Sequence, residues 1–475
     1  MSIQPKQAPL PPLRFLSTLS GELEVFVPLT PGKVKMYNCG PTVYGPQHIG
    51  NMRAAVCADI IRRTLTAWGY QVQQVINITD FGHLTSDADE GDDKMSTGLT
   101  REGMKLTLEN MRTLAERYME EYFTDLDQLG VDRAKITFPR ASDYIQEQIS
   151  VVQSLEQKGY AYQTAQGVYY DVSRFPDYGK LGHINLGGLR EGARVQENTQ
   201  KRGPLDFILW KSDQKLGWES LWGLGFPGWH IECTAMIFTL LGKQIDIHTG
   251  GIEHIPVHHN NEIAQAEAAT GKQFSRYWLH HDHITIEGRK ISKSQGNTIY
   301  LHNITDRGFD PLALRYWFLT AHYRTPANFT WEALEGASTA LRRLSTFYLE
   351  LPEGGTPDIP FLVQFYAALS VDLDTPKALA LVWGLTKDQE LSPTVKKATL
   401  KTIDNILGLG LTTAKPVQKL TIKSELPEDI QKLLHDRETA RKNKNFTLAD
   451  ELRTNIEGLG YTLKDTPEGQ EVSRT

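Results

Sequence analysis

The pattern of apolar positions predicts a parallel α/β sheet that begins near the start of the chain. Residues 34–37 read as a buried strand, residues 52–68 carry apolar side chains at helical spacing, and residues 71–78 form a second β-branched run. Strand, helix and strand in this order are typical of a parallel sheet. A strand over residues 244–248, followed by a helix over residues 256–270, indicates that the sheet resumes after a long interruption.

The interrupting region has a pattern of its own. Helical spacing covers residues 108–129 and 144–159, and residues 160–172 alternate between apolar and polar side chains as a β-hairpin does. We interpret this region as an insertion into the sheet domain.

Helical patterns dominate the part of the chain that follows residue 300. Asp310 and Pro311 open a helix that runs to Thr320, and Thr330 caps another. The apolar positions of this second helix share one face: Leu334, Ala337, Leu341 and Leu344. A linker is expected over residues 413–427.

A small module is predicted at the end of the chain. Its helices are expected over residues 428–442 and 447–457, and a short strand over residues 461–464. Thr447 and Asp450 have the spacing of a capping box at the start of the second helix.

Composition narrows the class of protein. The chain has 475 residues, so we expect three or more domains. Its net charge of -6 indicates no overall positive field that would attract nucleic acid. Its cysteines are Cys39, Cys57 and Cys233, too few for a secreted disulfide framework. The N-terminus lacks an apolar signal region, and no stretch of about 18 apolar residues occurs. A cytoplasmic protein without membrane contact is expected.

Two short segments far apart in the chain suggest one ATP site. They are His48-Ile49-Gly50-Asn51 and Lys290-Ile291-Ser292-Lys293-Ser294. The His48 imidazole can donate to a phosphate oxygen, the missing side chain at Gly50 leaves room for a nucleotide, and Lys290 and Lys293 could clamp a leaving pyrophosphate. Either segment alone is weak evidence, because a basic loop is more often only solvated.

A second set of residues suggests a metal site. His258 and Glu262 are four residues apart on a predicted helix and face the same way, and the thiols of Cys39 and Cys233 would complete a tetrahedral zinc set. His259 is within reach of Glu262 by the same spacing, so it remains a rival ligand. A buried cysteine without a metal is the simpler alternative.

Two further stretches are ambiguous by themselves. Gly228-Trp229-His230-Ile231-Glu232-Cys233 places an indole, an imidazole and a carboxyl beside a candidate ligand, although a buried aromatic with satisfied polar neighbours explains it as well. The acidic stretch Ser86-Asp87-Ala88-Asp89-Glu90-Gly91-Asp92-Asp93 is most simply a solvated loop, with metal binding as the less favoured interpretation.

Taken together, these motifs resemble those of class I aminoacyl-tRNA synthetases, in particular the cysteinyl-tRNA synthetases, from about residue 25 to 470. The resemblance rests on residues 37–44, the HIGH-like residues 48–51, residues 77–80, 228–233 and 258–262, the KMSKS-like residues 290–294, residues 310–315 and the stretch from residue 440 to 469.

The resemblance implies an α/β fold with a Rossmann-type parallel-sheet catalytic domain that carries an insertion, followed by an α-helical bundle and a small C-terminal module. The expected parts are an N-terminal extension (1–24), two catalytic halves (25–125 and 223–289), the insertion that helps hold the tRNA acceptor end (126–222), the KMSKS loop and stem-contact region (290–328), the anticodon-side bundle (329–412), the linker (413–427) and the C-terminal module (428–475).

It also implies an activity, a cysteine–tRNA ligase. Such an enzyme activates L-cysteine with ATP to cysteinyl-adenylate and transfers the cysteinyl group to the 3′ end of tRNA(Cys). One Zn²⁺ per subunit would select the substrate thiolate, Mg²⁺ would accompany ATP, and a monomer is expected.

The same resemblance assigns residues to these roles. The zinc ligands would be Cys39, Cys233, His258 and Glu262, with His259 as a neighbour. Thr79 and Trp229 would line the amino-acid pocket. The residues expected to bind ATP are His48, Gly50, Asn51, Gly251, Glu253, Lys290 and Lys293, of which His48, Lys290 and Lys293 would also be catalytic.

The sequence departs from the family pattern at several positions. Asn51 replaces the second histidine of HIGH, Glu253 stands where an aspartate is usual, and Asn260 stands where glutamate is common. The loop over residues 82–91 is an insertion without an assigned role. Two alternatives stay open: a zinc-dependent cysteine ligase of the mycothiol type that acts on an amino sugar, and a catalytically silent tRNA-binding paralogue. The C-terminal module weighs against the first, and the complete ligand set and lysines against the second.

Overall fold

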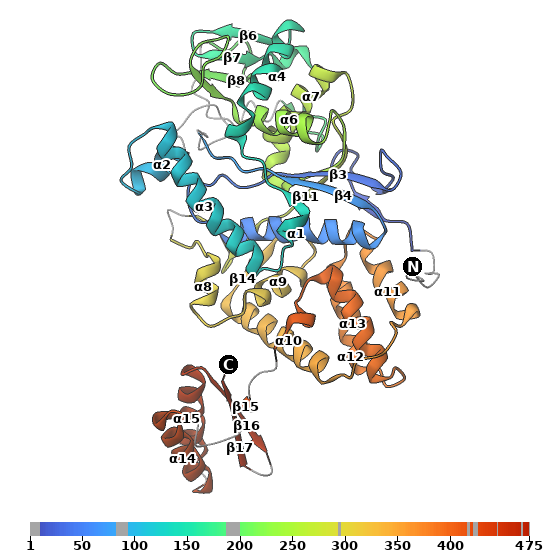
Figure 1. Cartoon of the computed structure of the whole chain (residues 1–475), viewed down its shortest axis with the longest axis vertical. Coiled ribbons are helices and arrows are strands. Elements are labelled where there is room, and N and C mark those ends of the chain that lie inside the picture. Colours follow the sequence, from blue (N-terminus) through green and yellow to red (C-terminus); the bar gives the residue numbers. More distant parts are fainter. Residues whose placement is uncertain are drawn as a thin grey trace.

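The protein is described from a computed structural model (Figure 1). The described residues are 10–81, 94–186, 200–292, 296–415, 419–420, 426–443, 445–466 and 469–474. Figure 1 shows an antiparallel insertion on one side of a central parallel sheet, helices on the other side, and a small module at the C-terminal end. No helix among the described residues is both long and apolar enough to cross a membrane.

The central sheet has five parallel strands. They lie in the order β11 (Ser275–His281), β10 (Ile245–Gly251), β3 (Lys33–Asn38), β4 (Gln71–Ile76) and β5 (Ile136–Thr137). Chain order therefore reverses between β3 and β10, where the first and second halves of the sheet meet. In doubly wound sheets the crevice outside this switch point binds ligands.

Helices cover both faces of the sheet. In the first half, α1 (Ile49–Ala67) runs beneath the strands in Figure 1, and α2 (Lys94–Arg101) and α3 (Leu108–Gln128) follow it. In the second half, α6 (Trp229–Leu240) precedes β10 and α7 (Asn260–Thr270) follows it. The helix predicted over residues 256–270 is not uniform, because Ile255–His259 form one π-helical turn before α7 begins.

The insertion contains a four-stranded antiparallel sheet in the order β6 (Ala161–Thr164), β7 (Gly167–Tyr170), β8 (Phe207–Ser212) and β9 (Gly225–Pro227). Helix α4 (Ile145–Gln157) precedes it. The predicted hairpin over residues 160–172 is confirmed as β6 and β7.

Two strands lie across the domain boundaries drawn from the sequence. β5 falls in the expected insertion (126–222) but pairs with β4 of the central sheet, and β9 falls in the expected second catalytic half (223–289) but pairs with β8 of the insertion. Such short strands carry too few residues for a periodic pattern to reveal them.

A three-stranded sheet joins the catalytic domain to the helices below it. Its order is β13 (Arg289–Lys290), β12 (Ile284–Ile286) and β14 (Ala327–Phe329). The helices of this part are α8 (Leu301–Thr305), α9 (Pro311–Leu319), α10 (Trp331–Glu350), α11 (Ile359–Leu369), α12 (Thr375–Lys387) and α13 (Pro393–Leu407). The predicted caps of two of them are confirmed, since Asp310 caps α9 and Thr330 caps α10.

The chain begins and ends in small sheets. Near the N-terminus, β1 (Arg14–Leu16) pairs with β2 (Leu23–Val25). The C-terminal module packs α14 (Glu428–Lys442) and α15 (Phe446–Gly458) with a sheet in the order β15 (Lys419–Leu420), β17 (Gly469–Arg474) and β16 (Tyr461–Thr466). β15 therefore lies inside the segment expected to be a linker.

The cap predicted for the last helix is wrong. The N-cap of α15 is Asn445, whose side-chain oxygen accepts a hydrogen bond from the Leu448 amide, so the cap lies two residues before Thr447 and the helix begins at Phe446. Asn and Thr are both good caps, and two candidates this close cannot be separated by residue type.

A buried charge cluster joins α1 to the helices below it. Asp59 of α1 is fully buried and pairs with Arg62, with Arg63 at 2.6 Å and with Arg315 of α9 at 2.7 Å. Arg315 also donates to the carbonyl oxygens of Leu129 and Leu407, at the ends of α3 and α13. The Asp59–Arg315 pair thus connects four helices, because Arg315 makes the contacts to α3 and α13.

The arginines control the charge of Asp59. Burial by itself would raise the pKa of this carboxyl, but Arg315, Arg63 and Arg62 outweigh burial and hold the pKa below its ordinary value. A carboxylate whose pKa is lowered by folding stabilises the protein above its unfolded pKa, and this contribution is lost as the pH falls below about 4.

We predict that Asp59→Asn lowers the free energy of unfolding at pH 7 by about 3–5 kcal/mol, because it leaves buried guanidinium groups without their counter-charge. Denaturant unfolding measures this change. The matched control is Asp127→Asn, which breaks the exposed pair with Arg133 and is expected to change stability by less than about 0.5 kcal/mol. Equal effects of the two substitutions would contradict the role assigned to Asp59.

Candidate active site

An open pocket of ≈ 440 Å³ lies at the switch point of the central sheet. The ends of β3 and β10, the start of α1 and the β12–β13 hairpin all contribute to it. Its lining includes most of the residues singled out in the sequence: Cys39, His48, Gly50, Asn51, Thr79, Trp229, Cys233, Gly251, Glu253, His258 and Lys290. Glu262 lies behind this surface, and Lys293 is outside the described residues.

The His48 side chain caps α1. Its Nδ1 atom accepts the backbone N–H groups of Gly50 and Asn51, at 3.1 and 3.4 Å. A neutral imidazole that accepts at Nδ1 carries its proton on Nε2, so this atom is a hydrogen-bond donor. Gly50 is required for the arrangement, because a Cβ atom there would lie 2.9 Å from the His48 ring.

Asn51 completes the cap. Its Oδ1 atom accepts the His48 backbone N–H at 3.2 Å, which makes the pair a reciprocal capping box. The amide oxygen is thereby used within the helix terminus. The Nδ2 group is the part of this side chain that suits an anionic ligand.

Backbone contacts join the HIGH-like segment to residues 299 and 300, shortly after the KMSKS-like segment. The Ile49 amide donates to the Ile299 carbonyl at 2.9 Å, and His48 and Tyr300 form an antiparallel bridge. Asn297 closes the base of the second segment, since it accepts from the Ser292 amide at 2.8 Å and donates to the Lys290 carbonyl at 2.9 Å. The HIGH-like and KMSKS-like segments therefore border one pocket.

Arg53 of α1 fixes the strand that leads to Lys290. The guanidinium donates to the carbonyl oxygens of Asp282 and His283, both at 3.0 Å, and of Thr325 at 2.8 Å. Because α1 also carries His48, one helix sets the distance between the two halves of the pocket.

Glu253 follows the glycines at the end of β10 and is half-exposed at the pocket. A Cβ atom on Gly251 would lie 2.2 Å from its carboxylate, so the glycine gives Glu253 room to fold back. Partial burial would raise the pKa of Glu253, but His254, His281 and His283 outweigh it and lower the pKa.

The four predicted metal ligands converge. One donor atom from each of Cys39, Cys233, His258 and Glu262 lies within 4.8 Å of the others. His258 Nε2 is 2.7 Å from Glu262 Oε1, and Cys233 Sγ is 3.9 Å from His258 Nε2. Two sulfurs, an imidazole nitrogen and a carboxylate oxygen are a donor set that suits Zn²⁺.

The protonation of this cluster also suits a divalent cation. Burial would raise the pKa of Cys39, but its hydrogen bond with Cys233 and the charge of His259 lower it well below the ordinary value. Burial would lower the pKa of His258, yet Glu262 and Cys39 raise it to about 10. These shifts favour an anionic donor at Cys39 and a proton on His258, and a metal ion bound here would replace that proton.

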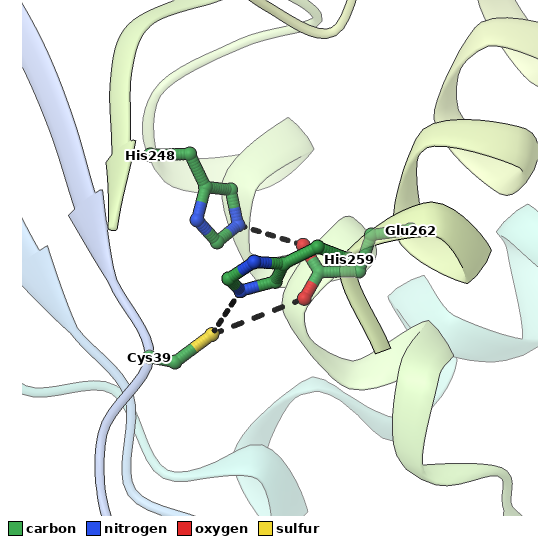
Figure 2. Close-up of side chains that lie close together, drawn as sticks. All are labelled: Cys39, His248, His259 and Glu262. Atoms are coloured by element: carbon green, nitrogen blue, oxygen red, sulfur yellow. Dashed lines mark hydrogen bonds and ion pairs between the residues drawn. The ribbon is translucent and has the colours of Figure 1, made fainter. Parts of the chain in front are cut away.

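A second group of four residues overlaps the first. Donor atoms of Cys39, His248, His259 and Glu262 also come within 4.8 Å of one another. Figure 2 shows these side chains converging from the end of β3, from β10, from the π-helical turn and from α7. His259 Nε2 is 3.3 Å from Cys39 Sγ, and His248 Nε2 is 2.7 Å from Glu262 Oε2. His259 therefore remains geometrically possible as a ligand.

The two groups differ in their access to the pocket. Cys39, Cys233 and His258 all line it, whereas of the second group Cys39 alone does. His259 is also engaged on its other side, where Nδ1 lies 2.8 Å from His280 Nε2. The first group is the one that can present a metal ion to a ligand in the pocket, and the second group lies behind it.

Thr79 and Trp229 flank the metal-type cluster on the pocket wall. The Trp229 and His258 rings lie 4.3 Å apart between centroids, and the Lys94 ammonium lies 5.5 Å above the Trp229 ring. The Thr79 hydroxyl donates to Glu232 at 2.8 Å. Burial raises the pKa of Glu232 to about 8, against the opposing effect of this hydrogen bond.

Several pocket residues were not anticipated from the sequence. They include Gly40, Gln47, Lys94, His254, His281 and His283. A signal existed for Gly40, since it stands in the motif with Cys39, and the structure shows why glycine is needed: a Cβ atom would lie 1.7 Å from the Asn77 carbonyl oxygen. The acidic stretch over residues 86–93 and the loop over residues 82–91 lie outside the described residues.

Solved structures share this fold. A methionyl-tRNA synthetase of Mycobacterium tuberculosis, bound to methionyl-adenylate, aligns with a TM-score of 0.54 over 79% of this chain and 90% of its own, at 13% identity. A leucyl-tRNA synthetase of Agrobacterium radiobacter, in a complex with tRNA, aligns with a TM-score of 0.59 over 81% and 84%, at 11% identity. The catalytic domain has the fold of a class I aminoacyl-tRNA synthetase.

Sequence comparisons are more specific. The family model of the tRNA synthetases class I (C) catalytic domain matches residues 25–339, and that of the cysteinyl-tRNA ligase anticodon binding domain matches residues 423–472. The chain is 45% identical over 467 residues to cysteine–tRNA ligase 1 of Burkholderia lata, covering 97% of each. It is 41% identical over 474 residues to the cysteine–tRNA ligase of Thermus thermophilus, covering 95% of this chain and 97% of that one.

The chain therefore belongs to the cysteinyl-tRNA synthetase family, and it is a ligase. The resemblance seen in the sequence is confirmed at the level of family and fold.

The cap geometry predicts a difference between two substitutions of His48. His48→Ala removes the acceptor of two helix N–H groups and should lower the free energy of unfolding by about 1 kcal/mol, whereas His48→Asn keeps a capping oxygen and should cost less than about 0.5 kcal/mol. Thermal unfolding of the two variants checks this. A His48→Ala variant as stable as the parent would show that the cap contributes nothing.

Proposed function

We propose that the protein activates L-cysteine with ATP to cysteinyl-adenylate and then transfers the cysteinyl group to the 3′ end of tRNA(Cys). The observation that carries the proposal is one pocket lined both by the two ATP-type segments and by two thiols and an imidazole, with the Glu262 carboxylate directly behind them. In the first step a carboxylate oxygen of cysteine bonds to the α-phosphorus, and the bond to pyrophosphate breaks.

The ATP half of the pocket would supply hydrogen-bond donors and positive charge to the phosphates. The proposed reaction needs no side-chain nucleophile. The His48 Nε2–H group, the Asn51 Nδ2 group and the Lys290 ammonium would bind phosphate oxygens, with Lys293 as a further cation. Gly251 and Glu253 would contact the nucleoside, and Mg²⁺ would accompany the phosphates. Catalysis would then consist of positioning and charge stabilisation.

Zn²⁺ held by Cys39, Cys233, His258 and Glu262 would supply a soft acceptor for the substrate thiolate. Serine differs from cysteine by one atom, and a steric pocket rejects such a difference weakly. A poorly acidic alcohol bonds zinc far less well than a thiolate does, so discrimination on the order of 10⁴ is attainable without an editing domain. Thr79 and Trp229 would hold the rest of the amino acid.

The C-terminal parts support the tRNA side of the proposal. The family model of an anticodon binding domain matches the terminal module, and this module has its own small core around Leu426, Ile430, Leu434, Ile456, Tyr461, Leu463 and Val472. The amino-sugar ligase and the silent paralogue are not favoured by the full-length similarity to cysteine–tRNA ligases. We further propose a cytoplasmic monomer that binds tRNA(Cys).

The zinc assignment predicts the outcome of two cysteine substitutions. Purified protein should contain about one zinc per chain, and Cys233→Ser should lose most of the zinc together with cysteine-dependent ATP–pyrophosphate exchange. Cys57→Ser is the matched control, because the Cys57 thiol lies away from the cluster beside Arg53 and Tyr323. A Cys233→Ser variant with full zinc and full exchange would refute the ligand set.

The module assignment predicts a separation of the two reaction steps. Deletion of the chain after Pro416 should leave cysteine-dependent pyrophosphate exchange within about threefold of the parent and reduce charging of tRNA by 10-fold or more, because no described residue of the module lines the pocket. Initial rates of both reactions measure this. Equal losses in the two reactions would contradict the domain assignment.

A further inference from the structure

Glu232 occupies an unusual position beside the pocket. It stands in the first turn of α6, directly before Cys233, and its side chain is fully buried. Its Oε2 atom accepts the Thr79 hydroxyl at 2.8 Å, while its Oε1 atom has no hydrogen-bond partner among the described residues. A buried carboxyl with one unpaired oxygen destabilises a protein, so its presence calls for a functional explanation.

Thr79 is the residue through which Glu232 can act. Thr79 lines the same pocket as the metal-type cluster and the ATP segments, whereas Glu232 is absent from the pocket lining. The Thr79 backbone is fixed as well, since its N–H donates to the Pro41 carbonyl and its carbonyl accepts from the Val43 amide. The hydroxyl group of Thr79 could still rotate, and its hydrogen bond to Glu232 fixes the direction of the O–H bond.

We propose that Glu232 is a positioning residue that holds the Thr79 hydroxyl oxygen as an acceptor for the α-ammonium group of the substrate amino acid. With the hydroxyl bonded to the carboxyl group, the Thr79 oxygen keeps a lone pair for an N–H donor on the pocket side. A second contact supports this orientation, because Asn77 Nδ2 lies 3.4 Å from the same oxygen and Asn77 Oδ1 accepts the Gly40 amide at 2.8 Å.

The electrostatics of the pocket make such an acceptor necessary. The Lys94 ammonium lies over Trp229 on the same wall, and a bound metal ion would add further positive charge. An ammonium group entering between them needs an oxygen acceptor that is already oriented, because a rotating hydroxyl could equally present its proton. This proposal rests on the proposed function, since it takes the pocket to bind an amino acid.

The test compares L-cysteine with 3-mercaptopropionate, which keeps the thiol and the carboxylate but lacks the amino group. Full-length Glu232→Met removes the acceptor at similar volume. It should raise the KM for cysteine in ATP–pyrophosphate exchange 10-fold or more and leave the inhibition constant of 3-mercaptopropionate and the zinc content unchanged. Glu232→Gln keeps an oxygen of the same shape and should stay within about threefold of the parent.

Substitutions of Thr79 keep the proposal testable if Glu232→Met does not fold. Thr79→Val should raise the KM for cysteine and leave the inhibition constant of 3-mercaptopropionate unchanged, whereas Thr79→Ser should keep a KM near that of the parent. In the Thr79→Val background, Glu232→Met should raise the KM for cysteine little further. Equal weakening of both ligands, or no change in any of these variants, would overturn the proposal. A parent protein that does not exchange pyrophosphate with cysteine would instead refute the proposed function.

Discussion

The pairing of β3 with β10 is the constraint on which the rest of the site depends. This parallel pair, with Asn38 opposite Thr249, brings the ends of two strands from separate halves of the chain to one edge of the sheet. Cys39 then lies near His258 of the π-helical turn and Glu262 of α7, and the start of α1 borders the same pocket as the end of β10. Because parallel strands release their chains at the same edge, a small number of backbone hydrogen bonds assembles residues that are more than 200 positions apart in sequence.

The helices below the sheet maintain this arrangement. Arg53 ties α1 to the strand that leads to Lys290, and the buried Asp59 cluster ties the same helix to α9 and to the end of α13. A displacement of the helical bundle would therefore also move the His48 cap, because α1 connects the two. Within the thiol cluster, Glu262 and Cys39 raise the pKa of His258, so a positive charge is favoured among the anionic groups that are buried beside aromatic rings.

Much of this could be predicted from the sequence, because periodicity and residue type carry the information. The strands β3, β4 and β10 of the central sheet, the hairpin of the insertion and the caps at Asp310 and Thr330 followed from local patterns, and the candidate ligand residues were selected by their chemistry and by resemblance. The π-helical turn before α7, the two-residue β5 and the true cap of α15 did not, since each depends on tertiary packing or on a choice between equivalent residues. The bond between Glu232 and Thr79 joins residues from different elements and has no local signature.

The most direct test of the account is zinc X-ray absorption spectroscopy of the zinc-loaded protein with and without substrate. Two sulfur ligands are expected in the free protein, from Cys39 and Cys233, and three in the presence of L-cysteine, with no change on addition of L-serine. A sulfur count that stays the same when cysteine binds would contradict the claim that the buried cluster recognises the substrate through its thiol.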